Sequence, residues 1–73
     1  MKGLIMLRTL ISSSNIRSIG WDNNILEVEF KNRRIYQYLN VPYVHFVNLL
    51  NARSAGTYLH AKIKKVYRYK RIR

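Results

Sequence analysis

Residues 16–30 read IRSIGWDNNILEVEF, and this stretch decides the fold. Apolar residues alternate with polar ones on both sides of Asn23-Asn24, and asparagine tolerates the positive φ angles of a tight hairpin turn. A two-residue loop places the apolar side chains on one face, with Trp21 opposite Leu26 and Ile19 opposite Val28. The small and acidic side chains then share the other face: Ser18, Gly20, Glu27 and Glu29. The stretch therefore predicts two antiparallel strands with one apolar and one polar face.

A third strand is expected at residues 34–40, RIYQYLN, because Ile and Tyr favour β structure. Two turns can lead into it. A two-residue turn pairs Phe30 with Ile35 and puts Tyr36 and Tyr38 on the face of the glutamates. A three-residue turn shifts the register, pairs Phe30 with Tyr36, and buries both tyrosines beneath the helices. We favour the buried arrangement, while exposed tyrosines would instead offer stacking platforms for bases.

The chain then changes to helical periodicity. Pro42 suits the first position of a helix. Four apolar residues follow at the spacing of one helical face and are expected to cover the sheet: Tyr43, Phe46, Val47 and Leu50. Ser54 can cap a second short helix. Its inner side would hold Ala55, Tyr58, Leu59 and Ile63. From Lys65 onward, alternation predicts a fourth strand or an extended arm.

These segments predict one domain over residues 1–73 of the α+β class. We expect a three-stranded antiparallel β-meander packed by two short helices, with a C-terminal basic strand or arm. Residues 1–14, MKGLIMLRTLISSS, mimic a targeting segment, but Arg8 ends the apolar run early. A first strand is the better interpretation of this stretch. The absence of cysteine from the sequence favours a cytoplasmic location.

Charge gives the strongest functional signal. The chain has 14 Lys and Arg against 3 Asp and Glu, a formal net charge of +11. Residues 30–73 contain no acidic residue, so the whole excess lies there. Seven basic residues crowd the end of the chain: Lys62, Lys64, Lys65, Arg68, Lys70, Arg71 and Arg73. Such a surface neutralises phosphates and releases counterions, so we predict nucleic-acid binding, to RNA more readily than to DNA.

Other residues extend this predicted surface. Arg33 and Arg34 add charge at the turn before the third strand. Tyr67 and Tyr69 alternate with basic residues and are expected on one side of a strand with Arg71, so their rings are candidates for stacking on bases. The alternative is that the basic half is only a solvated face. We favour polyanion binding because uncompensated positive charges repel one another and destabilise the compact state.

The sequence resembles the KTSC domain family over about residues 10–73. The resemblance rests on six short motifs: SSNI at 13–16, IGWD at 19–22, LEVEF at 26–30, Tyr36-x-Tyr38, Val41-Pro42, and Tyr67-Arg68-Tyr69. The chain departs from the family in a shortened first hairpin loop and in Arg33-Arg34, where the family is rich in glycine. The family is named for its place at the C-terminus of some lysyl-tRNA synthetases. This context suggests RNA binding, and the resemblance implies no catalytic residue.

Catalytic and metal-binding patterns are weak. The two histidines, His45 and His60, fall on different predicted helices without cysteine nearby, so we expect neither a metal nor a cofactor. The sequence also lacks a glycine elbow beside its serines. Asp22 with Glu29-x-Lys31 faintly resembles the groups of a metal-dependent nuclease, which we keep as a minor alternative. We therefore expect a non-catalytic protein.

The main alternative is a small protein-interaction module. Such a factor, encoded by a virus or a cell, would attach to a larger assembly without touching nucleic acid. Its anchor would be the apolar stripe of the first helix, but the sheet needs that stripe as a cover. We expect no membrane binding, because the basic block alternates as a strand does and offers no amphipathic helix.

Overall fold

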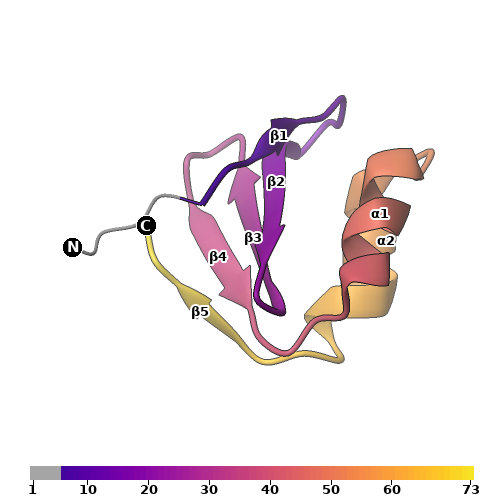
Figure 1. Ribbon diagram of the computed structural model, residues 1–73. Coiled ribbons are helices and arrows are strands. Elements are labelled where there is room, and N and C mark those ends of the chain that lie inside the picture. The colour runs from indigo at the N-terminus through magenta and orange to yellow at the C-terminus, as the bar shows by residue number, and fades with distance from the viewer. Residues whose placement is uncertain (1–5) are drawn as a thin grey trace.

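The structure is a computed structural model that describes residues 6–73. Five strands lie side by side in chain order, and each neighbouring pair is antiparallel. The helices pack on one face of this sheet (Figure 1). The elements are β1 (Thr9–Leu10), β2 (Ile16–Asp22), β3 (Ile25–Phe30), β4 (Ile35–Tyr38), α1 (Tyr43–Asn51), α2 (Ala55–Leu59), a π-helical turn (His60–Lys64) and β5 (Tyr69–Arg71).

The α+β class is confirmed, but the three-stranded description is wrong because both edges of the meander gain a strand. The predicted basic strand or arm is β5, in which Tyr69 lies opposite Tyr38 of β4. The N-terminal stretch supplies β1, in which Thr9 lies opposite Ile19 of β2. Two residues are too few for an alternation pattern, so the sequence could not separate β1 from its surroundings. Residues 1–5 of the expected first strand lie outside the described part of the chain.

The first hairpin confirms the predicted register. Trp21 lies opposite Leu26 and Ile19 opposite Val28. The two turn asparagines have φ angles of 50° and 65°, as a tight turn between twisted strands requires. The register shifts between Ile16 and Ser18, where Arg17 forms a β-bulge. The bulge lets Ile16 join the core while Ser18, two residues on, joins the polar face.

The second hairpin has a three-residue loop, yet neither predicted pairing occurs. The backbone N–H of Phe30 donates to the Arg34 carbonyl at 2.9 Å, so Arg34 is the partner of Phe30. Arg33 adopts a positive φ of 74° to close the loop. Tyr36 consequently lies opposite Val28, and Tyr38 lies opposite Leu26. Both tyrosines are on the helix side of the sheet, which is the arrangement that we favoured.

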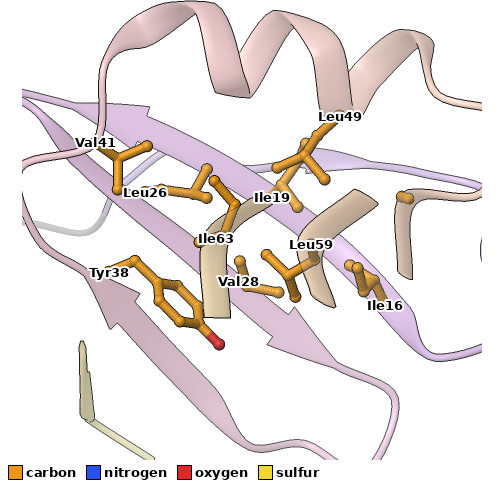
Figure 2. Close-up of a cluster of buried hydrophobic side chains, with 10 residues drawn as sticks. Ile16, Ile19, Leu26, Val28, Tyr38, Val41, Leu49, Leu59 and Ile63 are labelled. Carbon is orange, nitrogen blue, oxygen red and sulfur yellow. The ribbon is translucent and has the colours of Figure 1, made fainter. Parts of the chain in front are cut away.

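The core lies between this face and the helices (Figure 2). The sheet contributes aliphatic side chains and the fully covered ring of Tyr38. Leu49 comes from α1, Leu59 from α2, and Ile63 from the π-helical turn. Within residues 6–73 the buried hydrophobic residues are Ile16, Ile19, Leu26, Val28, Ile35, Tyr38, Val41, Leu49, Ala55, Leu59 and Ile63.

Only part of the predicted stripe of α1 covers the core: Phe46 packs against it, and Val47 is half-buried. Tyr43 is 54% exposed and Leu50 is 40% exposed, while Leu49 is buried. The start of the helix is fixed by Val41, whose carbonyl accepts the indole N–H of Trp21 at 2.8 Å and whose N–H donates to Asn24 at 2.8 Å. Pro42 therefore has an extended backbone and directly precedes the helix, whereas the sequence predicted it at the first helical position. Leu49 packs in the core together with Ala55 and Leu59 of α2.

The second helix begins as predicted. The Ser54 hydroxyl accepts the backbone N–H of Thr57 at 3.2 Å. Ala55 and Leu59 are buried on the inner side, followed by Ile63, and Tyr58 is half-buried. These side chains tie the short helix to the sheet, because a helix of this length has little stability of its own.

Replacing Ser54 with alanine should destabilise the domain by about 1 kcal/mol, because the Thr57 N–H loses its capping partner. Thermal unfolding of the variant would show this as a lower midpoint. Ser54→Asp is the matched control, because its carboxylate restores an acceptor at the helix start. Equal midpoints for Ser54→Ala and the parent chain would contradict the capping role.

Candidate nucleic-acid interface

The predicted basic residues do not form one surface, because they are spread over the helices, both faces of the sheet and the turn before β4. Lys62 and Lys64 are on the π-helical turn, and Lys65 and Arg68 lie on the link that leads to β5. Within β5, Arg71 lies opposite Tyr36 and therefore on the helix side. Lys70, Arg73 and the turn residue Arg33 belong to the other side or its rim, and Arg34 directly precedes β4. All of these basic side chains are exposed.

On the helix side, three aromatic rings form a continuous strip that we call the aromatic strip: Phe30, Tyr36 and Tyr69. The rings of Tyr36 and Tyr69 are nearly parallel, with 5.2 Å between centroids and 7° between planes. Phe30 meets Tyr36 edge-on at 5.6 Å. Tyr69 is 56% exposed although one ring face lies against Tyr36, so its outer ring face is accessible. The strip joins residues from three strands, β3, β4 and β5.

Two cations accompany the aromatic strip. The Lys64 ammonium lies 5.5 Å from the centroid of the Phe30 ring, within the range of a cation–π contact. Arg71 stands on the same strand as Tyr69 and opposite Tyr36. Sequence reasoning assigned Tyr69, Lys64 and Arg71 to the interface but did not include Phe30, whose ring meets Tyr36 diagonally across β3 and β4.

The other predicted stacking residue, Tyr67, does not join the strip. It is half-buried against the core, and its ring meets His45 edge-on at 5.7 Å. It precedes β5, so it does not share a strand face with Tyr69 and Arg71 as expected. The structure therefore corrects the prediction that Tyr67 and Tyr69 line one side of a strand.

Tyr38 is also withdrawn from the surface. Burial, with smaller contributions from neighbouring Tyr36 and Tyr69, raises the pKa of Tyr38 to about 12 from the ordinary 10.0. The folded protein thus holds this proton more tightly than the unfolded chain. Its contribution to stability is complete below pH 10, and it is lost as the pH rises toward 12.

An absorbance titration of phenolate should therefore show one tyrosine that ionises near pH 12, with stability falling over the same interval. Tyr38→Phe should remove that step. Tyr43→Phe, at an exposed position, should leave it in place. Persistence of the late step in Tyr38→Phe would show that another tyrosine is responsible.

The opposite face of the sheet holds the two glutamates of β3, on the polar face that the sequence predicted. Both are buried, since Glu27 is only 4% exposed and Glu29 only 9%. Arg8 crosses this face, forms an ion pair with Glu27, and lies 3.5 Å from Glu29. The Ser18 hydroxyl donates to Glu29 at 2.9 Å, and the Gln37 amide donates to Glu27 at 2.8 Å. Because Arg8 covers them, the two glutamates, Ser18 and Gln37 form what we call the buried polar cluster.

Beside this cluster lies an open hollow of about 890 Å³. Four basic side chains line it around Glu29: Arg17, Lys31, Arg33 and Arg73. Arg73 lies 3.3 Å from one Glu29 oxygen, and Arg17 lies 3.6 Å from the other. We call this feature the basic hollow. Sequence reasoning named Arg33 and Arg73 but did not group them with Arg17 and Lys31.

The remaining candidates for chemistry lie apart. The His45 ring nitrogen Nδ1 is 2.8 Å from the Tyr58 hydroxyl, whereas His60 is exposed on the π-helical turn. Among residues 6–73, no three His, Cys, Asp or Glu side chains gather closely enough to hold a metal ion. Within the same range no helix has the length and apolarity to cross a membrane.

Comparison with known proteins identifies the family. The family model for the KTSC domain matches residues 12–69. The chain is 41% identical over 70 residues to an uncharacterized protein of Stutzerimonas stutzeri (strain A1501), covering 92% of this chain and 99% of that protein. It is similar to the crystal structure of a KTSC domain protein from Yersinia pestis, with a TM-score of 0.88 and 38% identity over 94% of this chain and 100% of that one. Because the matched range contains β2 to β4 and both helices, the chain belongs to the KTSC domain family.

Proposed function

We propose that this protein is a non-catalytic module that binds single-stranded RNA through the aromatic strip and the basic residues around it. The observation that carries the proposal is the accessible Tyr69 ring, stacked on Tyr36 and flanked by Arg71. Stacked aromatic rings on an open part of a sheet are the means by which sheet-based RNA-binding domains receive bases. The tRNA context of the family resemblance points in the same direction.

Single strands suit this surface better than duplexes. A base can stack on the outer face of Tyr69 only when it is free of its own neighbours, as in loops and single strands. Each such contact contributes about 1–3 kcal/mol and is tolerant of sequence. The charges of Arg71 beside Tyr69 and of Lys64 beside Phe30 would neutralise phosphates along the strip.

The stacking role predicts that Tyr69→Ala weakens binding of a short single-stranded RNA roughly 5- to 150-fold, as expected for one lost stacking contact. Fluorescence anisotropy with labelled RNA at fixed salt would measure the change. Tyr43→Ala is a close control because Tyr43 is 54% exposed and Tyr69 is 56% exposed. Equal loss in both variants, or no loss in Tyr69→Ala, would remove Tyr69 from the interface.

The faces of β5 offer a sharper test with two adjacent residues of equal charge. Arg71 is on the side of the aromatic strip, and Lys70 lies opposite Gln37 on the other side. We expect Arg71→Gln to weaken RNA binding and to reduce the slope of log affinity against log salt by about one. Lys70→Gln should have the smaller effect. The reverse order would place the RNA on the polar face of the sheet.

One observation favours a second candidate, a protein-interaction module. The exposed side of α1 presents Tyr43, Val44 and Leu50, which sequence reasoning had assigned in part to the core. An apolar partner could pack on these side chains. Absence of RNA binding in low salt, together with a specific loss of partner binding in Val44→Asp, would favour this candidate over the first.

A further inference from the structure

We propose that the basic hollow is a binding site for a phosphate dianion, separate from the aromatic strip. Its four cationic side chains surround one carboxylate, Glu29, so the lining side chains leave an excess of three positive charges. Glu29 lies on the polar face of β3, whereas the neighbouring Phe30 belongs to the strip on the other face. The two sites therefore occupy different sides of the same strand.

Glu29 gathers the arginines but does not saturate them. Arg73 approaches one carboxylate oxygen at 3.3 Å, and Arg17 approaches the other at 3.6 Å. Each guanidinium carries five N–H donors in a planar fork, and Glu29 engages one nitrogen of each of these two side chains. The remaining donors are available to a second anion, and a planar fork suits the oxygens of phosphate.

Local structure holds several of the residues that line the basic hollow in place. Glu29 is held by the Ser18 hydroxyl at 2.9 Å and is 9% exposed. Arg17 is the residue of the β-bulge, which sets its backbone apart from the regular ladder. Arg33 is fixed in the turn with φ 74°. The fold thus brings like charges together from β2, from the loop after β3 and from the chain after β5.

The excess positive charge of the basic hollow indicates which class of ligand it would bind. Bringing several cations into one hollow is unfavourable unless an anion offsets their repulsion. A phosphate monoester carries about −1.5 to −2 charges at neutral pH and three acceptor oxygens, which matches this excess better than a monovalent anion does. The phosphate could be a free ion or the end of a nucleic-acid strand, and both present the same group to the hollow.

Titration of the full chain with inorganic phosphate, followed by amide NMR shifts at constant ionic strength set with chloride, tests the site. We expect saturable shifts around Arg17, Lys31 and Arg33. Arg17→Gln should weaken phosphate binding about tenfold, the loss expected for one charge-assisted contact. Arg53→Gln is the matched control, since it removes the same charge from the turn between the two helices.

The outcomes separate this site from the proposed RNA surface. A strand with a 5′-phosphate that binds more tightly than its 5′-hydroxyl counterpart, with the preference lost in Arg17→Gln, would support the site and name the strand end as the source. If both strands bind equally and inorganic phosphate still binds, the site is supported and its ligand is a small free phosphate, not a strand end. Unsaturable shifts, or equal weakening by Arg17→Gln and Arg53→Gln, would overturn the inference, whatever Tyr69→Ala does to RNA binding.

Discussion

Arg8→Ala is expected to cost about 3 kcal/mol of folding free energy, since it leaves two buried carboxylates without their common partner. Arg8 is paired with Glu27, whose side chain is 5% exposed, and it also lies 3.5 Å from Glu29. Its Nε donates to the Ser18 hydroxyl at 3.0 Å. Because the Arg8 side chain is itself 21% exposed, the lower end of the range for buried pairs applies.

A loss of this size would leave little stability, because one core of this length supplies only about 3–5 kcal/mol. A denaturant titration should therefore show that a large fraction of the variant is unfolded even before denaturant is added. Arg17→Ala is the control: Arg17 also contacts Glu29, but its side chain is 62% exposed, so less than about 1 kcal/mol should be lost.

A second substitution distinguishes charge from packing. Glu27→Gln in the Arg8→Ala background should restore part of the lost stability, because a buried amide does not require a counter-charge. The Gln37 amide, which donates to the Glu27 carboxylate in the parent chain, would still find the oxygen of the substituted amide as an acceptor. Absence of any restoration would mean that Arg8 acts mainly by covering the sheet.

Local chemistry made the first hairpin predictable. Asn23 and Asn24 allow one turn type, and only one register then keeps Ile19 and Leu26 on the same face. The second hairpin was harder because Arg33 takes the positive φ, and arginine does not signal that conformation. The sequence left the length of this loop open. It therefore predicted the face on which Tyr36 and Tyr38 lie but not their cross-strand partners.

The candidate site depended on contacts between distant segments, which local patterns do not encode. The aromatic strip requires β5 to pair with β4, so Tyr69 meets Tyr36 across 33 residues of chain. The buried polar cluster requires Arg8 to reach β3 across β2. The residue before Pro42 is likewise held by the Trp21 indole, which donates to the Val41 carbonyl, and periodicity within the helix cannot reveal this contact.

Gly20→Ala should produce a loss comparable to that of Arg8→Ala, by displacing the segment that carries Arg8. A methyl group at Gly20 would overlap the carbonyl oxygen of Leu7 and lie 3.0 Å from the Arg8 Cγ. Backbone cannot yield as a flexible side chain does, so the segment before β1 must move away from β2. That movement would withdraw Arg8 from Glu27 and leave this carboxylate without its counter-charge.

The two substitutions should therefore not add. In the Arg8→Ala background, Gly20→Ala should cost far less than it does alone, because the ion pair that it disrupts is already gone. Hydrogen exchange adds a structural readout, since the Ile11 amide, bonded to the Arg17 carbonyl at 3.1 Å, should lose protection in Gly20→Ala. The Val41 amide, at the far end of the sheet, should keep its protection relative to global stability. If the two losses of folding free energy add and the Ile11 amide stays protected, Gly20 is required by β2 itself and not for the placement of Arg8.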